Sequence, residues 1–173
     1  DAGEATYFSV VHGKTGALFA TATAIGASLG GATPEVVQEM HRFGLAFGSA
    51  FQLADDLLDL HGAEEDSGKP RGLDWAQRHA TLPLLYALRT APAATAAEIR
   101  ALWDQEAFTP EQFRTLTCLV EAAGGFEYGW QKVKEYREHA CARLDCVPAG
   151  AGRDALRHLC TDAFPLPILP SAV

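Results

Sequence analysis

Four side chains in the segment FQLADDLLDL have the types and the spacing needed to hold a metal ion. They are Gln52, Asp55, Asp56 and Asp59, at positions i, i+3, i+4 and i+7. In an α-helix this spacing places all four on one face. Carboxylates about 5–6 Å apart on such a face repel each other by about 3 kcal/mol at an effective dielectric of about 20. A hard divalent cation would remove the repulsion, and oxygen ligands one turn apart suit Mg²⁺, which favours sites shared with phosphates.

A solvated acidic face that serves only solubility is the simpler explanation of an isolated DDxxD pattern. Helix propensity does not explain the clustering, because aspartate is a poor residue in a helix interior. The same segment also carries Gly44 and Gly48 one turn apart, and Gly48 with Ser49 falls on the face of Gln52. These small residues predict a groove in which a slender ligand could lie.

Two cationic elements flank the acidic segment in the sequence. One is Lys14-Thr15, and the other is Lys69 with Arg71. Exposed lysines near carboxylates often form plain salt bridges worth about 0–1 kcal/mol. Carboxylates, a cation and lysines together indicate a diphosphate site, because the metal bridges acid to phosphate while the lysines contact the remaining phosphate oxygens.

The elements that must position these residues are expected to be helices throughout. Alanine and leucine are abundant, β-branched residues are sparse, and no short alternating segments indicate strands, which together predict an all-α chain. Helices are expected over residues 4–29, from 34 to about 62, and over 75–89, 94–105, 110–123, 126–144 and 152–163. Gly13 and Gly16 should interrupt the first of them, because glycine loosens a helix by about 1 kcal/mol relative to alanine.

Two helix starts carry clear signals. Thr33 is placed as the N-cap of one helix, with Pro34 at its first position and Glu35 in its first turn. Thr109 is placed as the N-cap of the helix over 110–123. No linker or internal repeat is evident, so residues 1–173 are expected to form a single domain that ends in a proline-rich tail over 164–173.

Composition argues against several classes of partner. The formal net charge is −8, and the 14 Lys and Arg residues are scattered, which argues against nucleic acid. Residues 15–34 contain no charge, but they are mostly Gly, Ala and Thr, which suits helix packing better than lipid. No transmembrane segment is therefore expected.

The cysteines favour a reducing compartment. The four cysteines show no CxxC spacing, and no signal peptide opens the chain, so a cytoplasmic location is expected. Cys141, Cys146, His158 and Cys160 could be considered as a zinc site, but their spacing is not a recognised one.

Five landmarks occur in an order and spacing that resemble a known family. They are KTGALF (14–19), FGLAFGSAFQLADDLLD (43–59), SGKPRGLD (67–74), TLPLL (81–85) and GGFEY (124–128). The chain resembles the C-terminal half of a trans-isoprenyl diphosphate synthase, in the polyprenyl synthetase family. The resemblance implies an antiparallel helical bundle of the isoprenoid-synthase type, with the N-terminal helices missing.

The resemblance also implies an activity and a set of roles. Such enzymes condense an allylic diphosphate with isopentenyl diphosphate, with the help of Mg²⁺, to give a longer trans-prenyl diphosphate. The metal would be bound by Asp55, Asp56 and Asp59. Catalytic roles fall to Lys14, Thr15 and Gln52; Lys14 and Lys69 would contact the diphosphate, and Phe51 and Gly48 would line the pocket. A homodimer is implied as well.

Two features depart from the family pattern. The first aspartate-rich motif is absent, so the chain is expected to hold about half of an active site and to be inactive alone. Arg78-His79 stands where many members carry Gly-Lys. Two alternatives stay open at this point: a non-catalytic or regulatory subunit of a heteromeric prenyl synthase, and a class I terpene cyclase.

Overall fold

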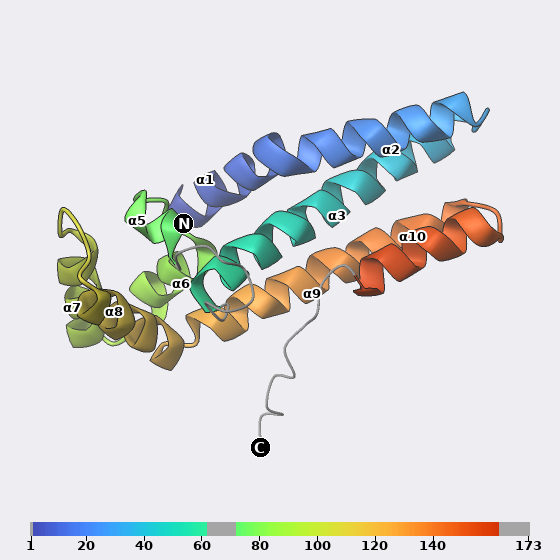
Figure 1. The fold of residues 1–173 in the computed structure, drawn as a ribbon. Coiled ribbons are helices and arrows are strands. Elements are labelled where there is room, and N and C mark those ends of the chain that lie inside the picture. Colours follow the sequence, from blue (N-terminus) through green and yellow to red (C-terminus); the bar gives the residue numbers. More distant parts are fainter. Residues whose placement is uncertain (1, 62–71, 163–173) are drawn as a thin grey trace, which may run out of the picture. The chain divides into compact units, whose positions relative to one another are not determined.

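The structure is a computed structural model that describes residues 2–61 and 72–162, and every regular element in these ranges is helical (Figure 1). The all-α prediction is thereby confirmed. The elements are α1 (Ala2–Val11), the π-helix η1 (His12–Gly16), α2 (Ala17–Leu29), α3 (Pro34–His61), α5 (Leu73–Ala76), α6 (Leu82–Thr90), α7 (Ala93–Trp103), α8 (Pro110–Ala122), α9 (Gly125–Arg143), the 3₁₀ turn η2 (Leu144–Cys146) and α10 (Ala151–Asp162). Lys69, Arg71 and the tail over 164–173 lie outside the described residues.

Both predicted helix starts are confirmed. Helix α3 begins at Pro34, and the hydrogen bond with the Thr33 side chain holds the pKa of Glu35 below its usual value. At the start of α8, the Thr109 hydroxyl accepts a hydrogen bond from the Gln112 backbone N–H at 3.2 Å. The Gln112 side chain accepts one in return from the Thr109 N–H at 2.9 Å, which completes a capping box.

The predicted interruption of the first helix is a π-helix and not a break. Residues 12–16 form one wide turn, and the backbone stays right-handed at both flanks, with φ −56° and ψ −46° at Val11 and φ −62° and ψ −34° at Ala17. A π-helical turn inserts one extra residue, which changes the direction in which the side chains around it project. Lys14 and Thr15 stand inside this turn.

The single helix predicted over residues 75–89 is wrong, because the structure has two helices there. Helix α5 ends at Ala76, and α6 begins only at Leu82. Between them Arg78 has a left-handed backbone, with φ +64°, and Thr81 is extended. Local propensity favoured a continuous helix, and contacts from distant residues override it.

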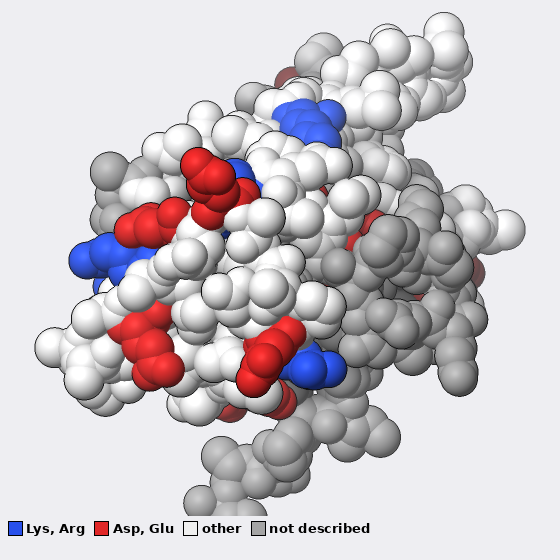
Figure 2. Space-filling view, turned by 60° about the vertical axis from the view of Figure 1, so that its left-hand side comes forward, with Lys and Arg blue, Asp and Glu red and all other residues white. Residues whose placement is uncertain are grey.

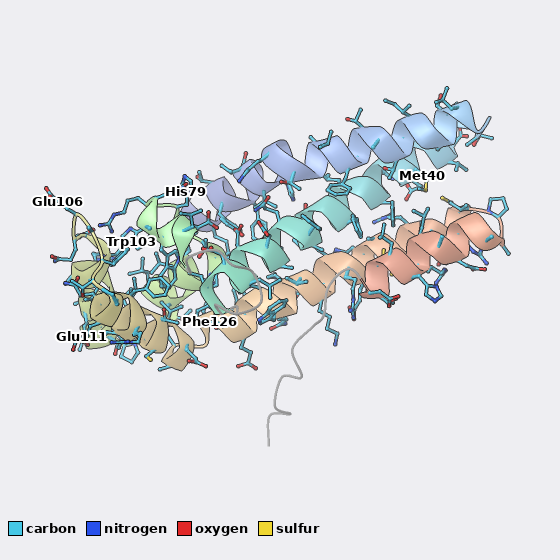
Figure 3. The ribbon with its side chains drawn as sticks, viewed as in Figure 1. Met40, His79, Trp103, Glu106, Glu111 and Phe126 are labelled. Atoms are coloured by element: carbon cyan, nitrogen blue, oxygen red, sulfur yellow. The ribbon has the colours of Figure 1, made fainter. Side chains whose placement is uncertain are left out.

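Those contacts converge on the side chain of Arg78. Its guanidinium lies 4.6 Å from the centre of the Phe108 ring and 5.5 Å from that of Trp103, and it donates a hydrogen bond to the Trp103 carbonyl. Cation–π contacts of this kind stabilise a desolvated arginine. Figure 3 labels Trp103, at the end of α7, and His79, which follows Arg78 between α5 and α6. These interactions offset the strain of a non-glycine residue at positive φ.

The chain divides into two compact units. The first comprises residues 1–7 and 55–130, and the second comprises 8–54 and 131–173. In the first unit α6, α7 and α8 pack against one another, with Leu84, Ile99 and Leu116 fully buried. Whether residues 1–173 form one domain stays a prediction.

In the second unit two pairs of helices lie side by side. Helix α2 packs along the first part of α3, and α10 folds back along the end of α9 (Figure 1). Arg143 of α9 donates to Glu39 of α3 at 3.2 Å, which ties the two helices together. None of the helices in the described part of the chain combines the length and apolar character that crossing a bilayer requires. On the face drawn in Figure 2, Lys and Arg side chains lie in separate small groups among Asp and Glu.

Candidate metal and diphosphate site

Two of the predicted catalytic residues meet in the second unit. The Thr15 hydroxyl, carried by the π-helical turn, donates a hydrogen bond to the Gln52 side-chain oxygen at 2.6 Å. Both residues are half-buried. This bond spans 37 positions and joins the interrupted first helix to α3. The structure therefore brings together Thr15 and Gln52, whose association no local spacing required.

Lys14 and Phe51 flank this pair and both reach solvent. Lys14 is exposed, and no ion pair to it occurs within the described residues. Phe51 has 43% of its surface exposed, and its ring lies 5.8 Å from that of Phe19. Lys14 directly precedes Thr15 in the sequence, and Phe51 directly precedes Gln52. An exposed cation and a partly exposed aromatic ring therefore adjoin the two residues that form the hydrogen bond.

Gly44 and Gly48, from which the groove was predicted, lie where α3 contacts α2. A Cβ atom at Gly44 would lie 2.3 Å from the Thr23 hydroxyl and 2.4 Å from the Phe19 carbonyl oxygen. A Cβ at Gly48 would lie 2.8 Å from the Phe19 ring and 3.0 Å from the Gly16 Cα. The two glycines let α2 approach α3 closely, and protein atoms fill the space at their Cβ positions. The groove and the pocket role of Gly48 stay predictions.

The three aspartates of α3, all within the first unit, have different surroundings. Asp55 is exposed, Asp59 is half-buried, and Asp56 retains only 7% of its surface. Their common helical face is therefore not a uniform solvated surface. Burial of a carboxylate is unfavourable unless donors compensate it, so Asp56 and Asp59 each require partners.

Asp56 receives a hydrogen bond from a residue that the sequence did not single out. The Tyr7 hydroxyl, from α1, donates to an Asp56 carboxylate oxygen at 2.5 Å. The two residues are 49 positions apart, and no periodicity or motif in the sequence links them. Only the packing of α1 within this unit could identify Tyr7 as a contact of the aspartate-rich segment.

Asp59 joins the end of α3 to the short helix α5. Its carboxylate accepts hydrogen bonds from the backbone N–H groups of Leu73 at 3.3 Å and Asp74 at 3.1 Å, and its carbonyl accepts one from Gly72 at 3.0 Å. Burial raises the pKa of Asp59 above its ordinary value, and the charges of Asp74 and Asp55 add to the rise, against the lowering effect of the two N–H donors.

Arg78-His79, the departure from the family pattern, takes two separate structural positions. Arg78 is held by the aromatic rings described above. The His79 ring nitrogen lies 3.6 Å from the Asp74 carboxylate, and its side chain is 64% exposed. Asp74 in turn gives its backbone N–H to Asp59. His79 is therefore the residue of this pair that lies nearer to the aspartate-rich segment.

The aspartates fit a divalent cation by donor chemistry. Across residues 2–61 and 72–162, no three His, Cys, Asp or Glu side chains already converge as a metal cluster. A carboxylate offers about four lone-pair sites, so Asp59 keeps acceptor capacity beside its two backbone N–H donors. Asp55 is exposed and can reach a cation from solvent. The oxygen-only donor set suits a hard ion that retains several waters.

The all-helical fold and the aspartate-rich long helix place the chain in the class of isoprenoid synthases that the landmarks indicated. A family profile described as polyprenyl synthetase matches residues 1–120. The chain belongs to this family. It is 35% identical to the nonaprenyl diphosphate synthase of Mycobacterium tuberculosis over 153 residues, which are 88% of this chain and 45% of that protein.

Two further comparisons agree. The octaprenyl diphosphate synthase of Escherichia coli is 33% identical over 156 residues, covering 90% of this chain and 48% of that protein. A crystal structure of a polyprenyl synthase from Caulobacter crescentus, complexed with calcium and isoprenyl diphosphate, matches with a TM-score of 0.83 and 34% identity, over 90% of this chain and 48% of that one. The chain thus spans about half the length of the relatives that it matches.

Proposed function

We propose that this chain carries the second aspartate-rich half of a trans-prenyl diphosphate synthase, which condenses an allylic diphosphate with isopentenyl diphosphate. The observation that carries the proposal is the arrangement on α3: Asp55 is exposed, while Asp56 and Asp59 are held by donors from other elements. Membership of the polyprenyl synthetase family supports it. The part of the relatives that this chain does not cover would correspond to the source of the remaining metal ligands.

Asp55, Asp56 and Asp59 would hold Mg²⁺, which when bound would neutralise charge that develops on the leaving diphosphate. We propose Mg²⁺ because its preference for oxygen ligands shared with substrate phosphates matches this donor set. The calcium in the Caulobacter complex is an ion of the same charge and ligand preference, which also supports an oxygen-ligated divalent cation.

Side chains of the second unit would contact the diphosphate or the reacting carbon chain. The exposed ammonium of Lys14 would contact diphosphate oxygens, and Lys69, which lies outside the described residues, would contribute similarly. The Gln52 side-chain carbonyl accepts a hydrogen bond from Thr15, and its dipole would face the allylic cation. Such dipoles stabilise positive charge because they are oriented before the reaction begins. Phe51 would pack against the apolar chain.

In this scheme the allylic C–O bond breaks with departure of diphosphate, the isopentenyl double bond attacks the allylic carbon, and a proton is then lost to leave a new trans double bond. The chain's residues bind and orient the reactants and exclude water from the cation. We also propose a homodimer and a cytoplasmic location, which the family resemblance supports.

The test is incubation of the protein that carries this chain with Mg²⁺, isopentenyl diphosphate and allylic diphosphates of several lengths. We expect release of pyrophosphate together with a longer prenyl diphosphate, measured by product chromatography. A cyclic hydrocarbon would indicate a terpene cyclase. Absence of turnover with every primer, in a protein that circular dichroism shows to be folded, would contradict the proposal.

A further inference from the structure

We propose that Tyr7 is a positioning residue for the aspartate-rich segment: its hydroxyl fixes the Asp56 carboxylate and so maintains the arrangement that binds the cation. The inference rests on the proposed function of that segment. It also rests on the hydrogen bond of 2.5 Å from the Tyr7 hydroxyl to Asp56, within one compact unit of the chain. That length is typical of a hydroxyl donating to an ionised carboxylate.

The burial of Asp56 explains why a donor is needed. With 7% of its surface exposed, Asp56 cannot rely on water for compensation in the way that the exposed Asp55 can. A buried carboxylate stays charged and in place only when hydrogen-bond donors face it. Tyr7 supplies such a donor from a rigid aromatic side chain, which has few rotamers to lose. An apolar residue at position 56 would have served packing alone.

Contacts of Glu4, one turn earlier along α1, help to hold Tyr7 in place. Glu4, at i−3 on the same helix, accepts a hydrogen bond from the Tyr128 hydroxyl and lies 3.5 Å from Arg89. The Tyr128 ring stacks on Tyr86, with centroids 4.2 Å apart and an interplanar angle of 18°. Residues at i and i+3 share a helix face, so Glu4 and Tyr7 face the same side of α1. The first turns of α1 are thereby anchored to α6 and α9, and the hydroxyl of Tyr7 is presented to Asp56.

The arrangement resembles the support that ligands receive in metal sites generally. Groups that hydrogen-bond to a ligand fix its orientation, and their loss typically weakens metal affinity by about 10- to 100-fold. Without the Tyr7 hydroxyl, the Asp56 carboxylate would lose a hydrogen bond that fixes its orientation. Asp55 would then lose a fixed neighbouring carboxylate, and the cation would be held by fewer oxygens.

The experiment measures binding of Mg²⁺ to the whole chain in the presence of inorganic pyrophosphate, by titration calorimetry. Tyr7→Phe removes the donor and keeps the ring. Asp56→Asn removes the charge, and the double variant completes a cycle. Tyr136→Phe is the matched control, because it deletes a half-buried tyrosine hydroxyl that lies 3.2 Å from His12. A ¹³C spectrum of the aspartate side-chain carboxyls follows Asp56 in the wild type, Tyr7→Phe and Tyr136→Phe without any need for metal.

We expect Tyr7→Phe to weaken Mg²⁺ binding by about tenfold and to shift the Asp56 carboxyl resonance, while Tyr136→Phe stays within about twofold of wild type. The double variant should bind no more weakly than Asp56→Asn, because both changes remove the same interaction. Wild-type affinity in Tyr7→Phe, additive losses in the double variant, or an equal loss in Tyr136→Phe would overturn the inference alone. Failure of the wild-type chain to bind Mg²⁺ with pyrophosphate would contradict the proposed function and this inference together.

Discussion

Asp55 and Asp56 are adjacent in the chain, yet one is exposed and the other is buried, because successive residues of a helix point about 100° apart. The difference in burial gives the two carboxylates different roles. Asp55 can approach a cation directly, whereas Asp56 is fixed by Tyr7 and Asp59 joins α3 to α5 through backbone N–H donors. The same residue type therefore serves three purposes within five positions of one helix.

Replacement of the first two aspartates by alanine should separate binding from stability. Asp55→Ala should change the free energy of unfolding by less than about 0.5 kcal/mol, as is usual for an exposed residue, and should abolish most turnover of the protein that carries this chain. Asp56→Ala should lower the free energy of unfolding by about 1–3 kcal/mol, because the Tyr7 hydroxyl loses its acceptor. Urea denaturation, monitored by circular dichroism, measures the free energy of unfolding of both variants. Loss of helicity in Asp55→Ala would assign that residue a structural role instead.

The raised pKa of Asp59 makes a prediction about pH. Because burial raises the folded-state pKa above its ordinary value of 3.8, the folded chain binds the proton more tightly than the unfolded chain does. The resulting stabilisation is fully present below that ordinary value and is lost as pH rises through the folded-state pKa. Relative to Asp59→Asn, the wild type should therefore lose unfolding free energy as pH rises from below 3.8 through the folded-state pKa. Urea denaturation across this range tests it, and a difference that grows in favour of the wild type would contradict it.

Among the elements, the contact of α2 with α3 is set by glycine. Gly44 has no room for a methyl group, since Thr23 and Phe19 atoms lie within 2.4 Å of the position that its Cβ would take. By contrast, a Cβ atom added at Gly26, inside α2, would have no atom within 4 Å. Close packing at Gly44 holds Phe19 against Phe47, with ring centroids 5.2 Å apart. The approach of the two helices also permits the Thr15–Gln52 bond.

This difference gives a matched pair of variants. Gly44→Ala should destabilise the chain by about 1–3 kcal/mol, because the added methyl group forces α2 away from α3. Gly26→Ala should leave stability unchanged or raise it by up to about 1 kcal/mol, because alanine is the better helix former. Thermal unfolding of both proteins provides the comparison. Equal effects would show that the helices do not pack as closely as the structure places them.

The sequence predicted the elements where local signals dominate. Thr33 and Thr109 mark helix starts through side-chain hydrogen bonds to the first turn, and both starts were placed correctly. The break at Arg78 could not be predicted, because its causes lie on Trp103 and Phe108, far along the chain. For the candidate site, helical spacing indicated the carboxylates, but burial of Asp56 and its bond to Tyr7 depend on packing between distant segments.

At the scale of the molecule, the chain spans about half the length of its relatives, so its part of the site should bind without completing the reaction. Thr15 and Gln52 lie in one compact unit, and the aspartates with Tyr7 lie in the other. We expect no prenyl transfer by the isolated chain, because the first aspartate-rich motif is absent from its sequence.

The central claim is that Asp55 and its neighbours bind a diphosphate through a divalent cation. The most direct measurement is the affinity of the chain for an allylic diphosphate with and without Mg²⁺, in wild type and in Asp55→Ala. We predict binding that requires Mg²⁺ and that weakens by about tenfold or more in the variant. Binding that is equally tight without Mg²⁺, or unchanged in Asp55→Ala, would contradict the account.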